Sequence, residues 1–234
     1  MTDPRTEDLA ANLTRLRADL GAACEAADRD PASVTLVAVT KTWPADDVRR
    51  LASLGVTDVA ENRDQEAGEK ATACRDLPLV WHFVGQVQTN KARSIAGYAD
   101  VVHAVDRARV VTALDRGAVD GGRRVRVLVQ VNLADSAETG RGGADPDAVL
   151  DLCAAVAASD ALDLGGVMGV APLGGDAGEA FARLEAVAGA VRAAHPGATW
   201  VSAGMSGDYR AAIRHGATHV RIGSALLGNR PPLR

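Results

Sequence analysis

The segment that decides the fold is VRVLVQV (125–131), followed by PDAVLDLCAAVAA (146–158) and LDLGGVM (162–168). The outer two pieces are runs of branched and aliphatic residues, which is typical of strands buried on both faces of a sheet. The middle piece is predicted to be a helix. A strand, a helix and a second strand in this order predict a parallel unit with a crossover helix.

The same alternation extends in both directions along the chain. Further strands are predicted at 34–39, 58–60, 79–84, 100–104, 199–201 and 218–222, and further helices at 44–54, 62–74, 89–95, 107–119, 178–194 and 208–215. An additional helix is predicted at about 4–28, where Asp3 is a suitable N-cap and leucines recur at spacings of three and four.

Eight strand–helix units in 234 residues predict one domain, a single (β/α)8 barrel with an extra N-terminal helix, over residues 1–234. A doubly wound open sheet is the alternative. No Gly-x-Gly-x-x-Gly follows the first strand, which weakens a dinucleotide-binding version of that alternative.

Composition excludes several classes of protein. The net charge of −4 argues against nucleic acid or an anionic membrane as the main partner, although it leaves room for a local anion site. No apolar run of about 18 residues occurs, and the polar N-terminus does not resemble a signal peptide. The three cysteines are scattered without a CxxC pair, so we expect no metal site and no disulfide, and a cytoplasmic protein with reduced thiols.

In a (β/α)8 barrel the chemistry lies at the carboxyl ends of the strands. Lys41 directly follows the first strand there, and a partly desolvated amine can form a Schiff base with an aldehyde; a surface lysine that caps the strand is the alternative. Asn62 either faces a ligand or caps a helix, and its neighbour Glu61 is a candidate partner for a cation. Alternation points His82 away from Trp81 and Phe83, and His82 is either a pocket residue or a satisfied core histidine.

Two small turns follow the last two strands, SAGMSGD (202–208) and RIGSA (221–225). Such turns present backbone N–H groups to an anion, and phosphate sites in these barrels are frequently built at this place. Arg221 either forms an internal salt bridge or donates to a ligand ring atom. A lysine together with a phosphate site predicts a phosphorylated carbonyl compound as ligand, either a sugar phosphate or pyridoxal 5′-phosphate (PLP).

Four motifs resemble the PLP homeostasis proteins, which share the barrel of the alanine racemase N-terminal domain. The motifs are WHFVGQVQTNK (81–91), VAVTK (37–41), GMSGD (204–208) and VRIGS (220–224), and the resemblance runs from about residue 8 to Arg230. Ala60 departs from this pattern, where glycine is common, and so does Arg141, in a loop where lysine is frequent.

The resemblance implies a role for each of eight residues. Lys41 would hold PLP as an internal aldimine, and Arg221 would approach the pyridine nitrogen. The phosphate would lie against Ser206, Gly223 and Ser224, with Met205 packing at that end, and Asn62 and His82 would line the pocket beside the ring.

The resemblance also implies a carrier with no catalytic residues, which buffers PLP or delivers it to apo PLP-dependent enzymes, and a monomer. An arginine at the pyridine nitrogen disfavours its protonation and weakens the ring as an electron sink. Racemisation needs a second base, and we expect no second domain to supply one. A racemase-like PLP enzyme is the main alternative, and a Schiff-base aldolase is a further one.

Overall fold

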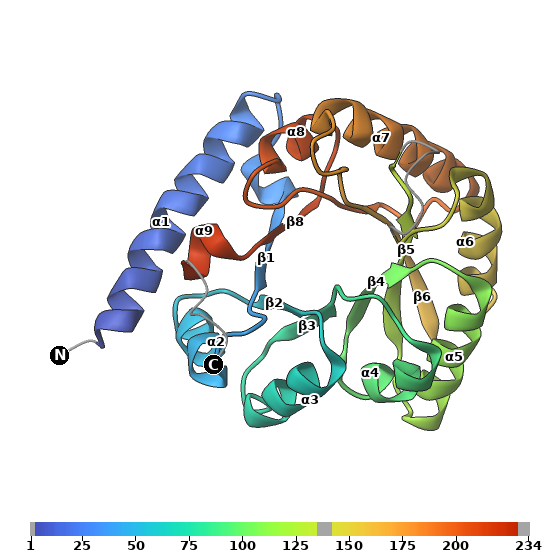
Figure 1. The fold of residues 1–234 in the computed structure, drawn as a ribbon, viewed down its shortest axis with the longest axis horizontal. Helices are drawn as coiled ribbons and strands as arrows, with labels where there is room; N and C mark the ends of the chain where they lie inside the picture. Colours follow the sequence, from blue (N-terminus) through green and yellow to red (C-terminus); the bar gives the residue numbers. More distant parts are fainter. Residues whose placement is uncertain (1–2, 135–141, 229–234) are drawn as a thin grey trace.

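Eight parallel strands form a closed barrel in the computed structural model of the chain (Figure 1). Neighbouring strands pair in chain order, and the last strand pairs with the first, with Val37 beside Arg221. This closure excludes the doubly wound sheet, which has two free edges. The strands are β1 (Thr35–Val39), β2 (Asp58–Glu61), β3 (Val80–Phe83), β4 (Val101–Val105), β5 (Val125–Val131), β6 (Leu162–Gly169), β7 (Trp200–Ser202) and β8 (His219–Ile222).

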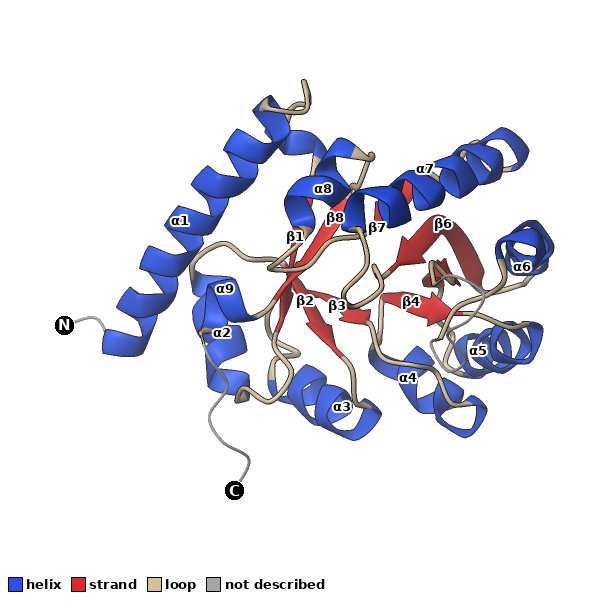
Figure 2. Ribbon diagram, turned by 45° about the horizontal axis from the view of Figure 1, so that its top comes forward, coloured by secondary structure: helices blue, strands red, loops and turns tan. Residues whose placement is uncertain are grey.

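A helix follows each strand, and the helices surround the barrel (Figure 2). They are α2 (Ala45–Ser53), α3 (Asp64–Ala73), α4 (Ala92–Tyr98), α5 (Ala108–Asp120), α6 (Val149–Ala157), α7 (Ala177–Ala194), α8 (Tyr209–Arg214) and α9 (Ser224–Leu227). The predicted strands and helices are confirmed, with shifts of a few residues at their ends. The largest shifts are at α4, where a 3-10 turn precedes the helix at 89–91, and at α6, which begins after a 3-10 turn at 146–148.

The structure describes residues 3–134 and 142–228. Arg141, one of the two departures from the family pattern, lies outside these residues. Within them, no helix is both long enough and apolar enough to span a bilayer.

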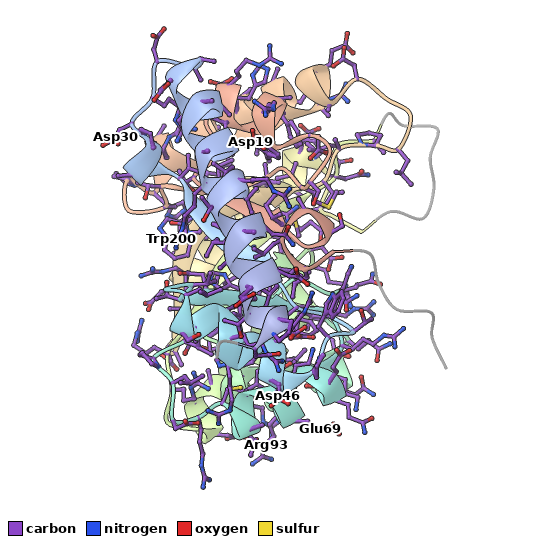
Figure 3. All side chains as sticks on the ribbon, turned by 90° about the vertical axis from the view of Figure 1, so that its left-hand side faces the viewer. Asp19, Asp30, Asp46, Glu69, Arg93 and Trp200 are labelled. Carbon is purple, nitrogen blue, oxygen red and sulfur yellow. The ribbon has the colours of Figure 1, made fainter. Side chains whose placement is uncertain are left out.

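The extra N-terminal helix is α1 (Pro4–Glu25), and Asp3 caps it by accepting a hydrogen bond from the Arg5 backbone N–H. It ends at Glu25, earlier than the predicted residue 28, because the chain turns there and Asp28 takes a left-handed φ of 52°. Leucines on one face of α1 pack against residues of α8 and α9. Figure 3 shows the helix lying across the outer side of the barrel.

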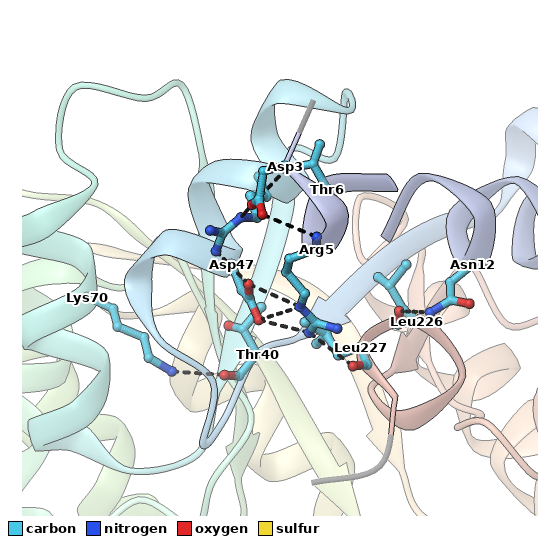
Figure 4. A network of polar contacts seen from close by, with 10 residues as sticks. Asp3, Arg5, Thr6, Asn12, Thr40, Asp47, Lys70, Leu226 and Leu227 are labelled. Carbon is cyan, nitrogen blue, oxygen red and sulfur yellow. Dashed lines mark hydrogen bonds and ion pairs between the residues drawn. The ribbon is translucent and has the colours of Figure 1, made fainter. Parts of the chain in front are cut away.

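Polar contacts tie α1 to both ends of the barrel sequence (Figure 4). The Arg5 guanidinium pairs with Asp47 of α2 at 2.8 Å and donates to the Leu227 carbonyl of α9 at 3.0 Å. The Asn12 amide donates to the Leu226 carbonyl at 2.9 Å. The helix therefore fastens the first and last strand–helix units together.

The two faces of each strand have different surroundings. Trp81 and Phe83 of β3 pack against side chains on the helices, whereas His82 between them lies inside the barrel beside His103. This confirms the predicted alternation at β3. The interior is unusually polar near β3, β4, β7 and β8, because Ser202 and Arg221 also point inward and hydrogen-bond to each other at 2.6 Å.

Candidate functional site

A cavity of about 520 Å³ opens at the carboxyl ends of the strands. Ligand pockets commonly have volumes of about 300–1,000 Å³, so this cavity suits a small molecule. Seven of the eight predicted residues line it, namely Lys41, Asn62, Met205, Ser206, Arg221, Gly223 and Ser224. Arg221 lies in β8 itself and the other six follow β1, β2, β7 and β8, and these four strands are neighbours in the closed sheet. Closure of the barrel thus brings together residues as far apart in the sequence as Lys41 and Ser224, 183 positions.

His82 is the exception among the predicted residues, because it does not line the cavity. Its imidazole is 1% exposed and lies deeper in the barrel, where Nδ1 meets His103 Nε2 at 2.7 Å and Nε2 meets Asp58 Oδ1 at 3.0 Å. The satisfied core histidine is therefore the interpretation that fits the contacts of His82. Alternation predicts the face of a strand residue but not its depth along the barrel axis.

Lys41 is half-buried at the end of β1, and contacts from α3 hold the backbone on both sides of it. Lys70 Nζ donates to the Thr40 carbonyl at 2.8 Å (Figure 4), and the Thr42 N–H donates to Glu66 Oε1 at 2.6 Å. Thr42 has a φ of 70°, in the left-handed region that β-branched residues rarely adopt. The loop that presents Lys41 is therefore held in a conformation it would not adopt alone.

A buried ion cluster underlies this loop. Lys70 Nζ lies 2.7 Å from both Glu61 Oε1 and Glu66 Oε1, and the Thr40 hydroxyl donates to Glu61 Oε1 at 2.6 Å. Glu61 is fully buried, and its Oε2 has no hydrogen-bond partner. Burial raises the pKa of Glu61, although the hydrogen bond from Lys70 opposes this. The expectation that Glu61 pairs with a cation is confirmed.

The sequence did not reveal Glu66 and Lys70 as part of this support. A Glu and a Lys four residues apart on a helix usually form an exposed pair, and burial of the lysine is the unusual feature here. Asn62 does not cap α3, because the N-cap residue of that helix is Arg63. The Asn62 backbone instead lies against Gly85, where a Cβ would come within 2.1 Å of the Asn62 carbonyl oxygen. Glycine at 85 therefore lets two walls of the cavity approach closely.

The turns after β7 and β8 meet at the cavity wall. The Ser224 hydroxyl lies 3.3 Å from the Ser206 hydroxyl, and the Asp208 carboxylate accepts from the Met205 N–H at 2.6 Å. Gly204 before this turn has a φ of 89°, and a Cβ there would lie 2.7 Å from that of Ala212. Hydroxyl groups from two loops thus converge on one spot, which suits an acceptor-rich group such as phosphate.

Arg221 is buried at the inner end of the cavity without a carboxylate partner among the described residues. Nη1 donates to Ser202 Oγ at 2.6 Å, and Nη2 donates to the Gly169 carbonyl at 3.0 Å. These contacts do not support the internal salt bridge. Burial lowers the pKa of Arg221 to about 10, which still leaves it protonated at neutral pH. Its partners are neutral and use only part of its five N–H donors.

The fold and this cavity define the class of protein: a (β/α)8 barrel with a lysine after the first strand and small turns after the last two. Residues 11–231 match the family model described as alanine racemase, N-terminal domain. Alanine racemase of Clostridium difficile has the same fold, with a TM-score of 0.73 at 14% identity over 96% of this chain and 60% of that chain.

More similar proteins narrow the class to a family. The pyridoxal phosphate homeostasis protein of Mycobacterium tuberculosis is 43% identical over 97% of this chain and 94% of its own length. PipY of Synechococcus elongatus, solved with PLP bound, is 33% identical with a TM-score of 0.82, over 94% of this chain and 100% of that chain. The chain belongs to the family of pyridoxal phosphate homeostasis proteins.

Proposed function

We propose that the protein binds PLP in the cavity at the carboxyl ends of the strands and serves to buffer or deliver it. The observation that carries the proposal is the meeting of Lys41, the two serine turns and buried Arg221 around one cavity. Each group suits a different part of PLP: an amine for the aldehyde, hydroxyl groups for the phosphate, and a guanidinium for the ring nitrogen. The likeness to PipY with PLP bound supports the same ligand.

Bound PLP supplies an aldehyde that reacts with primary amines and a ring that withdraws electrons. In this proposal the Lys41 amine would hold PLP at its aldehyde carbon, with release of water, and Ser206, Gly223 and Ser224 would hold the phosphate. Asn62 and Met205 line the remaining walls of the cavity. Arg221 would donate a hydrogen bond to the ring nitrogen and disfavour its protonation, because two cationic groups would otherwise face each other.

The lining of the cavity favours a carrier over a racemase. Among the described residues that form it there is no Asp, Glu, His, Cys or Tyr, so Lys41 is the one side chain there that can act as a base. Tyr209 packs in the apolar cluster with α1, and Tyr98 packs beside Gly68 of α3. An enzyme that moves a proton between two faces of an amino acid needs a second base.

Absorption spectroscopy and borohydride trapping test the binding proposal. Wild-type protein purified with PLP is expected to show an absorption band of a lysine-bound chromophore, and borohydride should fix PLP to Lys41, detected by peptide mass. Lys41→Ala should abolish the trapped product. The control variant Lys91→Ala removes an exposed lysine outside the cavity and should leave the product unchanged. A trapped product at another site in Lys41→Ala would contradict the proposal.

A second experiment separates the carrier from an enzyme. The loaded protein is expected to exchange the α-proton of alanine no faster than free PLP does, and to reconstitute an apo PLP-dependent enzyme when the two are mixed. Rapid exchange would favour the racemase-like alternative.

We further propose that the chain is one domain over 1–234 and acts as a cytoplasmic monomer, which size-exclusion chromatography and cell fractionation test.

A further inference from the structure

A row of hydrogen-bonded side chains runs through the barrel interior from the cavity to the amino-terminal end of β2. Arg221 Nη1 donates to Ser202 Oγ at 2.6 Å, and Ser202 Oγ lies 2.9 Å from His103 Nδ1. His103 Nε2 lies 2.7 Å from His82 Nδ1, and His82 Nε2 lies 3.0 Å from Asp58 Oδ1. The row crosses from β7 to β4, which are not neighbours in the sheet, so it traverses the interior.

One set of hydrogen-bond directions fits both ends of this row when each imidazole carries a single N–H. A guanidinium cannot accept, so the Ser202 hydroxyl accepts from Arg221, and its own proton is available for His103 Nδ1. A neutral imidazole has one N–H, so His103 donates through Nε2 to His82 Nδ1. His82 then donates through its own Nε2–H to the Asp58 carboxylate. In this arrangement each ring nitrogen of the two histidines, the Ser202 hydroxyl and Asp58 Oδ1 has a hydrogen-bond partner.

The charges agree with this direction. Burial lowers the pKa of His103, and the neighbouring His82 lowers it further, so His103 is neutral at physiological pH. Burial alone would raise the pKa of Asp58, but hydrogen bonds from His82 and Thr57 outweigh it and hold the pKa below its usual value. The row therefore has a carboxylate at one end, a guanidinium at the other, and a neutral His103 between them.

We propose that Asp58, His82, His103 and Ser202 are positioning residues that orient Arg221 toward the pyridine nitrogen of PLP, an inference that rests on the proposed function. An arginine side chain has many rotamers, and its direction inside an apolar barrel depends on its acceptors. Ser202 Oγ and the Gly169 carbonyl hold two different guanidinium nitrogens. The histidines supply the acceptor that turns the Ser202 proton away from Arg221.

Variants along the row test the proposal in the loaded protein. Ser202→Ala removes an acceptor of a buried cation, and we expect the Kd for PLP to rise roughly tenfold or more. The absorption maximum of bound PLP should also shift, because the ring nitrogen loses a fixed donor. Ser202→Thr retains the hydroxyl and should stay near wild type. Ser159→Ala, which removes a hydroxyl that donates to the Ala155 carbonyl of α6, should change neither quantity.

A variant at the far end distinguishes positioning from local packing. Asp58→Asn keeps the shape of the side chain, which is 17% exposed, and removes the charge that anchors His82. A spectral shift in this variant is expected and would not follow from a merely structural role. The Asp58→Asn variant also tests the positioning role if Ser202→Ala does not fold. Wild-type Kd and absorption maximum in folded Ser202→Ala, or in folded Asp58→Asn, would overturn the proposal.

A measurement without PLP separates this inference from the proposed function. Nitrogen-15 NMR of the unloaded protein should show His82 and His103 as neutral Nε2–H tautomers. An Nδ1–H tautomer at His103 would overturn the row even if PLP binds. If wild-type protein gave no trapped product at Lys41, the proposed function would fail, and the positioning role would fail with it although the tautomers were as expected.

Discussion

Replacement of Lys70 by methionine tests the buried cluster beneath Lys41. The Lys70 side chain is 8% exposed, and its ammonium group contacts Glu61, Glu66 and the Thr40 carbonyl. Methionine has a similar length and fills most of the same space, so the change removes a charge more than it removes volume. Glu61 then remains fully buried without its cation.

The expected loss of stability follows from this unpaired charge. Removal of one partner from a buried ion pair costs about 3–5 kcal/mol, because the other charge stays desolvated. For a chain of this length each kcal/mol lowers the melting temperature by about 2–4 °C, so we expect a fall of about 6–20 °C. The deficit should shrink as the pH falls, because the pKa of Glu61 is raised in the folded state and protonation relieves the buried charge.

Urea denaturation of three proteins provides the measurement. Lys70→Met is compared with wild type and with the double variant Lys70→Met/Glu61→Gln, which removes both charges and keeps the bond from Thr40. The double variant should recover more than half of the lost free energy of unfolding. The reasoning would be refuted if Lys70→Met cost less than about 1 kcal/mol, as exposed pairs do, or if the double variant were no more stable than the single one.

Further predictions concern glycine, histidine and thiol groups. Gly85→Ala should destabilise the fold by more than about 2 kcal/mol in urea denaturation, because its Cβ would meet the Asn62 carbonyl, whereas Gly189→Ala, with open space in α7, should stabilise it by about 0.5–1 kcal/mol. Burial lowers the pKa of His219 to about 4. The stability that neutral His219 contributes is therefore present above pH 6.5 and is lost as the pH falls toward 4. Between pH 6.5 and 4, His219→Phe should reduce the slope of the free energy of unfolding against pH by up to about 1.4 kcal/mol per pH unit. An unchanged slope would contradict this. Burial raises the pKa of all three thiols, and native protein should react with a thiol reagent only as fast as it unfolds, which a labelling time course checks at Cys24, Cys74 and Cys153.

The barrel was readable from the sequence because its strands are continuous apolar runs. Val125–Val131 is found with the predicted bounds, because a strand covered on both faces is a nearly continuous apolar run whose first and last residues stand out in the sequence. The end of α1 is less predictable from the sequence, because the chain turns where Asp28 adopts a left-handed φ that most residues avoid.

The sequence predicts those residues of the candidate site whose location depends on following a strand directly. Lys41 and Ser206 line the cavity because they directly follow strands, and strand ends meet at the mouth of a barrel. Lys70 and His103 were not predicted, since a lysine on a polar helix and a histidine in an apolar strand look ordinary. Their roles depend on which side chains face them across the fold, and a single sequence does not record that.

Closure of the barrel by β1 and β8 has a consequence for the order of events during synthesis. The ribosome adds about 5–20 residues per second, so the 180 positions from Lys41 to Arg221, 221 minus 41, separate their emergence by roughly 9–36 s. A nascent chain therefore carries Lys41 while 180 further residues are added, before Arg221 on the opposite wall of the cavity exists. If Lys41 and Arg221 hold PLP as proposed, the complete pocket forms only once β8 has been made, and bound PLP would then link the first and last strands of the barrel.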